Sequence, residues 1–296
     1  MQQPYKILIY GTGVIGSIYA TKLSNAGFNV SVYSRGNRLQ VLQKKGVLYH
    51  DNGTIKKADV KVLEEIRSTD IFDFIFVTVR RKQIEKALME LKSNNSPNII
   101  TMVNTANGYE TWEDIIGKDR LIPAFPGAGG KIENDILTYQ LTSRIVQPTT
   151  FGELNGERTH RIRKLHEIFV SSKIPCSISK NMDVWQKCHL AMVIPLANGI
   201  YLDGGNNYTT SKNKQALNYM SVELKRNFNS IKNMGLQITP KKLNIFRLLP
   251  HWLISIVLGY IYNTKFAETL INSHVQVARD ETEILSREFS NFIADK

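Results

Sequence analysis

The chain has 296 residues, of which 42% are hydrophobic and 9% aromatic. This composition is typical of a soluble globular protein, and the length is sufficient for one large domain or two ordinary ones. The net charge is +12, but the basic residues are spread along the chain, with no zinc-ligand spacing and no basic motif interleaved with aromatics. The charge therefore predicts binding of anionic small molecules and argues against nucleic acid as a partner.

The first elements predicted along the chain are a strand over residues 7–10, a helix over 17–26 and a strand over 30–33. A G-x-G-x-x-G motif connects the first strand to the helix, and in that position it is a strong signal for a dinucleotide-binding βαβ unit. Its first glycine permits the tight turn, its second lets the backbone approach a pyrophosphate, and its third lets the helix pack on the strand. The motif supplies six candidate cofactor-binding residues: Gly11, Thr12, Gly13, Val14, Ile15 and Gly16.

The end of the second strand indicates which dinucleotide is bound. Ser34 and Arg35 stand where an NAD-preferring site has an acid, Arg38 follows, and no acid occurs before Asp51. A carboxylate would repel a 2′-phosphate, whereas a guanidinium binds it with paired charge-assisted hydrogen bonds. The sequence therefore predicts NADP(H) as the cofactor, with Ser34 and Arg35 at the 2′-phosphate.

The elements that follow continue the alternation of strands and helices. Strands are predicted over 74–79 and 98–103, with a helix over 83–91 between them. Such alternation predicts a doubly wound parallel sheet, whose ligands collect at the carboxyl ends of the strands. Arg80 and Asn104 both follow predicted strands at this edge.

The pattern changes from mixed to helical near residue 178. Before this point we expect a glycine-rich loop at 127–130, strand-like segments at 138–141 and 143–147, a helix over 157–171 and a short strand over 174–178. Beyond it the predicted helices cover 184–194, 213–234, 248–262 and 267–293. The sequence therefore predicts an NADP-binding Rossmann domain over residues 1–178 and an all-helical substrate domain over residues 179–296.

The stretch from residue 248 to 264 has no charged side chain and lies between Arg247 and Lys265. Its length is at the lower limit for a membrane span, and it contains Pro250 and several polar residues. We expect a buried helix that lines the substrate cleft, or a subunit interface of a homodimer, and no membrane contact. Two cysteines and the lack of a secretory signal pattern predict a cytoplasmic location.

Taken together, these motifs resemble those of the ketopantoate reductase (2-dehydropantoate 2-reductase) family. The resemblance extends over the whole chain, from the glycine motif to the segment around Trp185-Gln186-Lys187, where the second domain begins. The other matching segments are Val77-Thr78-Val79-Arg80 with Gln83, Val103-Asn104, Glu268 and Ala278-Arg279-Asp280-Glu281. It implies an NADP-dependent reductase that acts on a small 2-oxo acid in pantothenate biosynthesis, with no metal.

The resemblance also implies the roles of single residues. Lys187 corresponds to the general acid, which stabilises the charge on the carbonyl oxygen and then donates a proton. Asn104 corresponds to an amide that positions the cofactor and this lysine, although Asn107 is a rival. Glu268 corresponds to a carboxylate that binds substrate, and Arg80 to a basic residue near the adenosine phosphate.

Two positions depart from the family pattern. Ala191 and Pro195 stand four and eight residues after Lys187, where family members that reduce ketopantoate have asparagines. A pocket that lacks these amides is expected to take a different or more apolar substrate. Two alternatives therefore stay open: an opine- or 3-hydroxyacid-type dehydrogenase, and a non-catalytic NADP-binding regulatory protein.

Overall fold

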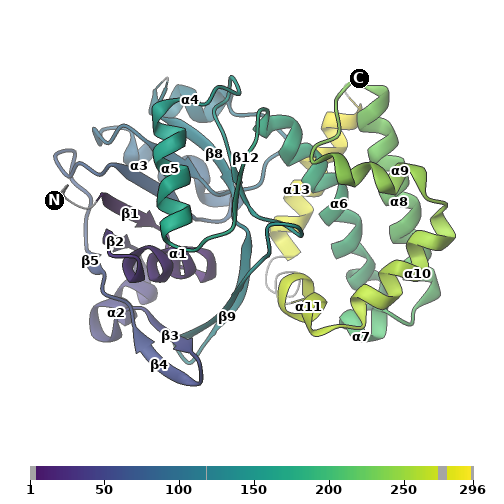
Figure 1. The fold of residues 1–296 in the computed structure, drawn as a ribbon, viewed down its shortest axis with the longest axis horizontal. Coiled ribbons are helices and arrows are strands. Elements are labelled where there is room, and N and C mark those ends of the chain that lie inside the picture. The colour runs from purple at the N-terminus through teal and green to yellow at the C-terminus, as the bar shows by residue number, and fades with distance from the viewer. Residues whose placement is uncertain (1–4, 118, 273–278, 295–296) are drawn as a thin grey trace. The chain divides into compact units, whose positions relative to one another are not determined.

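The computed structural model describes residues 5–117, 119–272 and 279–294, without the side chains of residues 270 and 272. The chain forms two compact units, residues 1–103 with 109–182, and residues 104–108 with 183–296 (Figure 1). The expected α/β architecture with a helical C-terminal part is confirmed. The division of roles at residue 178, with cofactor before it and substrate after it, stays a prediction.

The first unit is built on an eight-stranded sheet with the order β12-β11-β8-β7-β6-β1-β2-β5. Neighbouring strands from β5 to β8 are parallel, and β8 and β11 are antiparallel. The carboxyl ends of β1, β2, β6 and β7 therefore share one edge. The strands are β1 (Lys6–Tyr10), β2 (Asn29–Tyr33), β5 (Lys61–Leu63), β6 (Phe74–Val77), β7 (Ile99–Thr101), β8 (Leu121–Phe125), β11 (Thr149–Phe151) and β12 (Cys176–Ile178).

Helices cover both faces of this sheet. Because β2 and β7 lie on opposite sides of the β1–β6 pair, right-handed crossovers place α1 (Val14–Asn25) and α3 (Ile84–Leu91) on opposite faces. α5 (His160–Ser171) lies on the same face as α1 (Figure 1), and the two helices share a core with the sheet. The remaining helices of this unit are α2 (Gly36–Lys45), η1 (Arg81–Gln83) and α4 (Glu110–Ile116).

A second, four-stranded sheet was not predicted. Its order is β4-β3-β10-β9, with β3 (Leu48–Asp51), β4 (Thr54–Lys57), β9 (Ala128–Glu133) and β10 (Ile136–Leu141). The expected loop at 127–130 is wrong, because most of it belongs to β9. A Cβ on Gly130 would lie 2.3 Å from the Thr138 carbonyl oxygen, so this glycine permits close strand pairing. The expected strand at 143–147 is also wrong, because residues 144–146 form a turn.

The second unit is helical and has its own hydrophobic core. α6 and α13 run antiparallel, because Lys187 near the start of α6 contacts Phe292 near the end of α13, whereas Tyr201 bonds to Thr282 (3.3 Å between hydroxyl oxygens). The elements are α6 (Met182–Asp203), α7 (Asn207–Thr210), α8 (Lys214–Asn233), η2 (Lys241–Asn244), α9 (Ile245–Leu248), α10 (His251–Tyr262), α11 (Lys265–Ala267), the π-helical turn η3 (Glu268–Asn272) and α13 (Arg279–Ala294).

The uncharged stretch forms α10, which is only half buried. Its inner face packs on α8 through Ile254, Leu258 and Tyr262, while Trp252 and Tyr260 on the outer face are exposed. The helix is therefore buried on one face only, and the expected substrate cleft or subunit interface on its other face stays a prediction. Within the described residues, no helix is both long and apolar enough to cross a membrane.

Candidate active site

The glycine motif follows β1, and its glycines have the geometry that a phosphate-binding turn requires. Gly11 has a φ of +97°, which residues with a side chain rarely adopt. A Cβ on Gly16 would lie 1.9 Å from the Gly11 carbonyl oxygen, so only glycine lets α1 approach the turn this closely. A Cβ on Gly13 would meet no described atom within 4 Å, so the space beside it is open to a ligand. No described side chain caps the first N–H groups of α1, which are then available to an anion.

A cavity of about 520 Å³ opens at this turn. It lies at the carboxyl ends of β1, β2 and β6, where the doubly wound sheet places ligands. The Thr12 hydroxyl is buried here and has no hydrogen-bond partner among the described residues, so it is available to a bound group. The predicted cofactor residues that line this cavity are Gly11, Thr12, Gly13, Ser34, Arg35 and Arg80. Val14, Ile15 and Gly16 begin the adjoining helix, behind the lining.

Arg35 carries an acidic partner that the sequence did not reveal. Its guanidinium pairs with Glu90 of α3, at 2.6 Å between Nη1 and Oε1. The other carboxylate oxygen of Glu90 accepts a hydrogen bond from the Tyr10 hydroxyl. Burial, and then this hydrogen bond, raise the pKa of Tyr10, so the phenol stays protonated and donates. A 2′-phosphate at Arg35 would therefore approach a guanidinium that is already paired.

A second arginine is held against the glycine turn. Arg38 donates from Nε to the Thr12 carbonyl oxygen (2.9 Å) and from Nη2 to the Ser17 hydroxyl (3.2 Å). Burial lowers the pKa of Arg38, but a guanidinium stays charged at neutral pH. Asp135 also lines the cavity, and its bond to Lys45 (2.5 Å) lowers the pKa of the Asp135 carboxyl. The cavity therefore keeps an excess of positive charge.

Lys187 lies in the second turn of α6, and its side chain is 13% exposed. Its Nζ pairs with Asp183, one turn earlier, at 2.6 Å. The same nitrogen lies 4.7 Å from the centre of the Phe292 ring. The carboxylate and the ring face both attract a cation, so this arrangement holds an ammonium group in a fixed position. An ammonium with a proton to donate is what the reduction of a carbonyl requires.

The structure distinguishes the two candidate amides. Asn104 has a buried Oδ1 with no hydrogen-bond partner among the described residues, whereas Asn107 is exposed, and its backbone N–H donates to the Thr105 hydroxyl (3.1 Å). The segment is anchored to α13, because Glu288 accepts from the Ala106 N–H (3.0 Å) and from Thr105 (3.3 Å). A buried acceptor without a donor is uncommon and favours Asn104 as the amide that meets a ligand.

Glu268 lies in a different environment from Lys187. It begins η3 and accepts a hydrogen bond from the Tyr208 hydroxyl (2.8 Å). Tyr208 follows the carboxyl end of α6, and 16 residues of helix from Lys187 to Asp203 span about 24 Å. Among the described residues, Lys187 makes no hydrogen bond or ion pair with Glu268. The substrate-binding role of Glu268 stays a prediction. Ala278, part of the matching C-terminal segment, lies outside the described residues.

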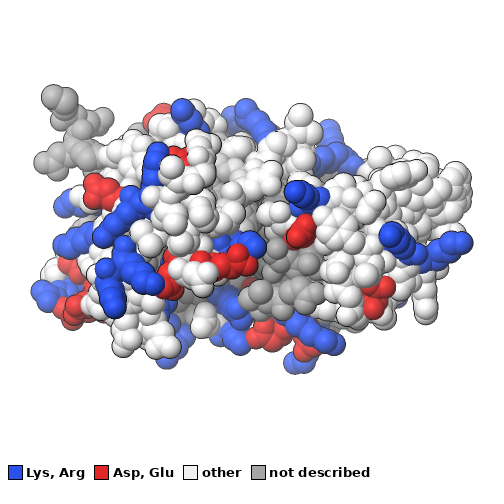
Figure 2. Space-filling model, turned by 90° about the horizontal axis from the view of Figure 1, so that it is seen from below, with Lys and Arg blue, Asp and Glu red and all other residues white. Residues whose placement is uncertain are grey.

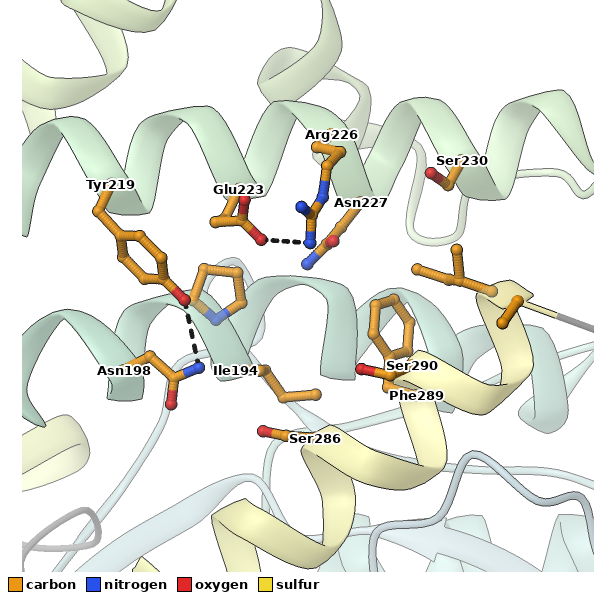
Figure 3. Close-up of a pocket in the computed structure, with 13 residues that line it drawn as sticks. Ile194, Asn198, Tyr219, Glu223, Arg226, Asn227, Ser230, Ser286, Phe289 and Ser290 are labelled. Carbon is orange, nitrogen blue, oxygen red and sulfur yellow. Dashed lines mark hydrogen bonds and ion pairs between the residues drawn. The ribbon is translucent and has the colours of Figure 1, made fainter.

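A second cavity, of about 360 Å³, lies within the helical unit between α6, α8 and α13 (Figure 3). Asn198 of α6 points to Tyr219 of α8, at 3.4 Å between Nδ2 and the hydroxyl oxygen. Further along α8, Glu223 pairs with Arg226 (2.6 Å). The cavity is therefore lined by amide, hydroxyl and charged groups, and its volume is that of a small-molecule site.

The two positions that depart from the family pattern have different surroundings. Ala191 is fully buried in the helical core, whereas Pro195 lines the second cavity. Because proline has no N–H, the Ala191 carbonyl loses its helical donor. Asn227 of α8 replaces it, at 3.2 Å from Nδ2 to the Ala191 oxygen. The proline is therefore accommodated by an amide on a neighbouring helix.

Comparison with known proteins decides the family. The model of the ketopantoate reductase PanE/ApbA family matches residues 7–156, just over half of the chain. The chain belongs to this family. The family resemblance found in the sequence is thereby confirmed, and with it a Rossmann fold of the NAD(P)-dependent reductase type.

Two curated relatives of this ketopantoate reductase family member match part of the chain. The uncharacterized oxidoreductase YkpB of Bacillus subtilis is 28% identical over 191 residues, and a 2-dehydropantoate 2-reductase of Mesorhizobium japonicum is 24% identical over 209 residues. Each match covers 62% of this chain, and 60% and 63% of the respective relatives.

Solved structures of the ketopantoate reductase family share the fold. The 2-dehydropantoate 2-reductase of Geobacter metallireducens has a TM-score of 0.68 at 14% identity and covers 97% of this chain and 99% of its own. That of Porphyromonas gingivalis has a TM-score of 0.65 at 14% identity and covers 99% of both chains. A D-mandelate dehydrogenase with NADH and anilino(oxo)acetate has a TM-score of 0.66 at 14% identity, covering 97% and 99%.

Several residues around these sites were missed in the sequence. The Asp183–Lys187 ion pair could have been predicted from the i,i+4 spacing of the two residues on a helix. Glu90 and Phe292 gave no such signal, because they reach Arg35 and Lys187 from elements distant in sequence.

Proposed function

We propose that this chain is an NADPH-dependent reductase of a 2-oxo acid, with 2-dehydropantoate as the first candidate substrate. The observation that carries the proposal is the cavity at the glycine turn, with open space beside Gly13, guanidinium groups at its rim and a Thr12 hydroxyl that has no partner in the described part of the chain. Membership of the ketopantoate reductase family supports reductase chemistry. With this substrate the enzyme would act in pantothenate biosynthesis, in the cytoplasm.

The residues of the first unit fit the phosphates of such a cofactor. Gly11, Thr12 and Gly13, with the N–H groups that begin α1 at Val14 and Ile15, bind the pyrophosphate. Arg35 binds the 2′-phosphate, supported by Ser34, Arg38 and Arg80. NADPH supplies the hydride that reduces the carbonyl carbon.

The residues of the second unit handle the proton. The Lys187 ammonium group forms a hydrogen bond with the carbonyl oxygen of the substrate and stabilises the negative charge that develops on this oxygen. It then donates a proton to the oxygen. Asp183 and Phe292 keep the ammonium in place between turnovers. Asn104 offers its unpaired Oδ1 to the cofactor or to this ammonium.

Calorimetric titration with NADPH and NADH tests the cofactor assignment. We expect clearly tighter binding of NADPH, and a smaller difference between the two in Arg35→Ala. Arg67→Ala is the control, because Arg67 is an exposed arginine of the same unit that does not line the cavity. Equal affinity for both nucleotides in the unmodified protein would refute the choice of NADPH.

Substitution of the lysine tests the assignment of the acid. Lys187→Met should lower kcat on the order of 10²-fold or more, the usual scale for loss of a general acid, while NADPH binding is retained. The matched control is Lys180→Met, which removes an exposed lysine shortly before α6. A near-normal kcat in Lys187→Met would show that another group donates the proton.

A further inference from the structure

Residues 104–108 belong to the helical unit, although they lie between β7 and α4 in the chain. Thr105 is 2% and Ala106 3% exposed, and Ala106 is part of the hydrophobic core of the helical unit. The segment contains both candidate amides, Asn104 and Asn107. Any contact that fixes its backbone therefore also restrains the position of these amides.

Glu288 of α13 is a buried acid. Many Lys, Arg, Asp and Glu side chains lie on the surface (Figure 2), whereas Glu288 is only 8% exposed. Glu153, the other buried acid among the described residues, forms an ion pair with Arg161 at 2.5 Å. A carboxylate is costly to bury unless hydrogen bonds replace those that it makes with water, so the groups that bind Glu288 are held firmly.

The groups that bind Glu288 include two in the segment 104–108. Its Oε2 accepts a hydrogen bond from the backbone N–H of Ala106 (3.0 Å) and from the hydroxyl of Thr105 (3.3 Å). The Thr105 hydroxyl accepts in turn from the backbone N–H of Asn107 (3.1 Å). Hydrogen bonds to an ionised acceptor are stronger than those between neutral groups. One carboxylate oxygen therefore restrains the three residues that directly follow Asn104.

We propose that Glu288 is a positioning residue for the Asn104 amide in the reduction proposed above, on which this inference rests. The Oδ1 of Asn104 is buried and has no hydrogen-bond partner among the described residues. Because no such bond fixes this oxygen, its position depends on the backbone around it. A misplacement of about 1 Å at a reacting group can lower a rate on the order of 10²-fold. Glu288 prevents such a displacement without touching the substrate.

The helix that carries Glu288 also contacts the proposed proton donor. Phe292 follows Glu288 by four residues, and residues at this spacing lie on the same face of a helix. The centre of the Phe292 ring lies 4.7 Å from Nζ of Lys187. One face of α13 therefore contacts both the segment that contains Asn104 and the ammonium group of Lys187.

Steady-state kinetics of Glu288 variants tests the proposal. Glu288→Ala removes the acceptor, and we expect kcat to fall on the order of 10- to 10²-fold. Glu288→Gln keeps a carbonyl oxygen for both hydrogen bonds and should retain most of the parent kcat. NADPH affinity should be unchanged in both variants, because the glycine turn binds the pyrophosphate. The matched control is Asn291→Ala, which removes an exposed polar side chain from the same helix.

A double-mutant cycle distinguishes positioning from a general structural effect. In an Asn104→Ala background there is no amide to position, so Glu288→Ala should lower kcat little further. Hydrogen exchange of the Ala106 amide should be faster in Glu288→Ala and near normal in Glu288→Gln. If Glu288→Ala does not fold, Thr105→Ala takes its place in the cycle, because it removes only the hydroxyl bond, and Thr105→Ser is then the variant that should retain kcat.

The possible failures are distinguishable. An active parent whose kcat is unchanged in folded Glu288→Ala, or in its substitute Thr105→Ala, would overturn the positioning role and leave the proposed function intact. An equal loss of kcat with and without the Asn104 amide would give Glu288 a structural role only. A parent that oxidises no NADPH with any 2-oxo acid would refute the proposed function, and the positioning role with it.

Discussion

At the scale of single residues, Glu90 competes with the proposed 2′-phosphate for the Arg35 guanidinium. A 2′-phosphate must share the Arg35 guanidinium with this carboxylate, whose second oxygen is held by Tyr10. Arg38 is bonded to the glycine turn and has no such acidic partner among the described residues. The proposed preference for NADPH therefore depends on the balance between one acid and two arginines.

Removal of the Glu90 charge should favour NADPH further. In Glu90→Gln we expect NADPH to bind more tightly, by up to about five-fold, since a partly exposed ion pair contributes about 0.2–1 kcal/mol. NADH binding should not change, because it has no 2′-phosphate. The control is Glu85→Gln, because Glu85 lies on the same helix but pairs with Arg81 and not with Arg35. Weaker NADPH binding in Glu90→Gln alone would mean that Glu90 positions Arg35 instead of competing for it.

The two cysteines should be unreactive in the folded protein. Burial raises the pKa of the Cys188 thiol to about 11 and also raises the pKa of Cys176. The thiolate is the reactive form, so a thiol reagent at a pH of about 8 should label neither cysteine until denaturant is added. Because the folded-state pKa of Cys188 is above its ordinary value of 9.0, its contribution to stability is present below that pH and is lost as the pH rises toward 11. Rapid labelling without denaturant would contradict this burial.

At the scale of elements, α6 continues as a helix through Pro195. The Asn227 amide makes this possible, because it bonds to the carbonyl that Pro195 leaves without a donor. Asn227 is 4% exposed, so water does not easily replace it. The position where the family pattern has an asparagine is thus coupled to a residue on α8.

A double-mutant cycle tests this coupling. Asn227→Leu should lower the free energy of unfolding by about 1–3 kcal/mol, the cost of a buried carbonyl without a partner. In a Pro195→Ala background the helix supplies its own N–H, so the same substitution should cost clearly less. Urea denaturation measures both values. An identical cost in the two backgrounds would show that Asn227 does not compensate for the proline.

The doubly wound sheet of the first unit could be predicted from the sequence because its signals are local. A glycine turn between an apolar strand and a helix specifies its own geometry, and the residues after each parallel strand must share one edge of the sheet. The second sheet could not be predicted, since β3 and β10 pair across more than 80 residues of sequence. For the same reason, the contact of Glu90 with Arg35 could not be predicted.

The helical unit was predicted only in outline. Helical periodicity located α6, α8 and α10, but it could not tell which apolar face of α10 would be covered by α8. Motif matching placed Lys187 and Glu268 in one site, whereas the structure gives each its own partners. A residue role that is taken from a family pattern must therefore be checked against the residue's contacts in the folded structure.

At the scale of the whole molecule, each unit has a hydrophobic core of its own among the described residues. A cofactor that binds the first unit should therefore stabilise that unit first. NADPH at about 100 times its dissociation constant should add about 2.7 kcal/mol to the free energy of opening. Hydrogen exchange should slow in β1, α1 and α2, with little change in α10. If hydrogen exchange slowed only in the helical unit, the nucleotide would not bind at the glycine turn.

The most direct test of the account is turnover. Purified protein is given NADPH and a panel of 2-oxo acids that includes 2-dehydropantoate and phenylglyoxylate, the 2-oxo acid that corresponds to mandelate. The account predicts steady NADPH oxidation with at least one of them, lowered on the order of 10²-fold in Lys187→Met. If NADPH binds but is not oxidised with any member of the panel, the account is contradicted. The alternative of a non-catalytic NADP-binding protein would then apply.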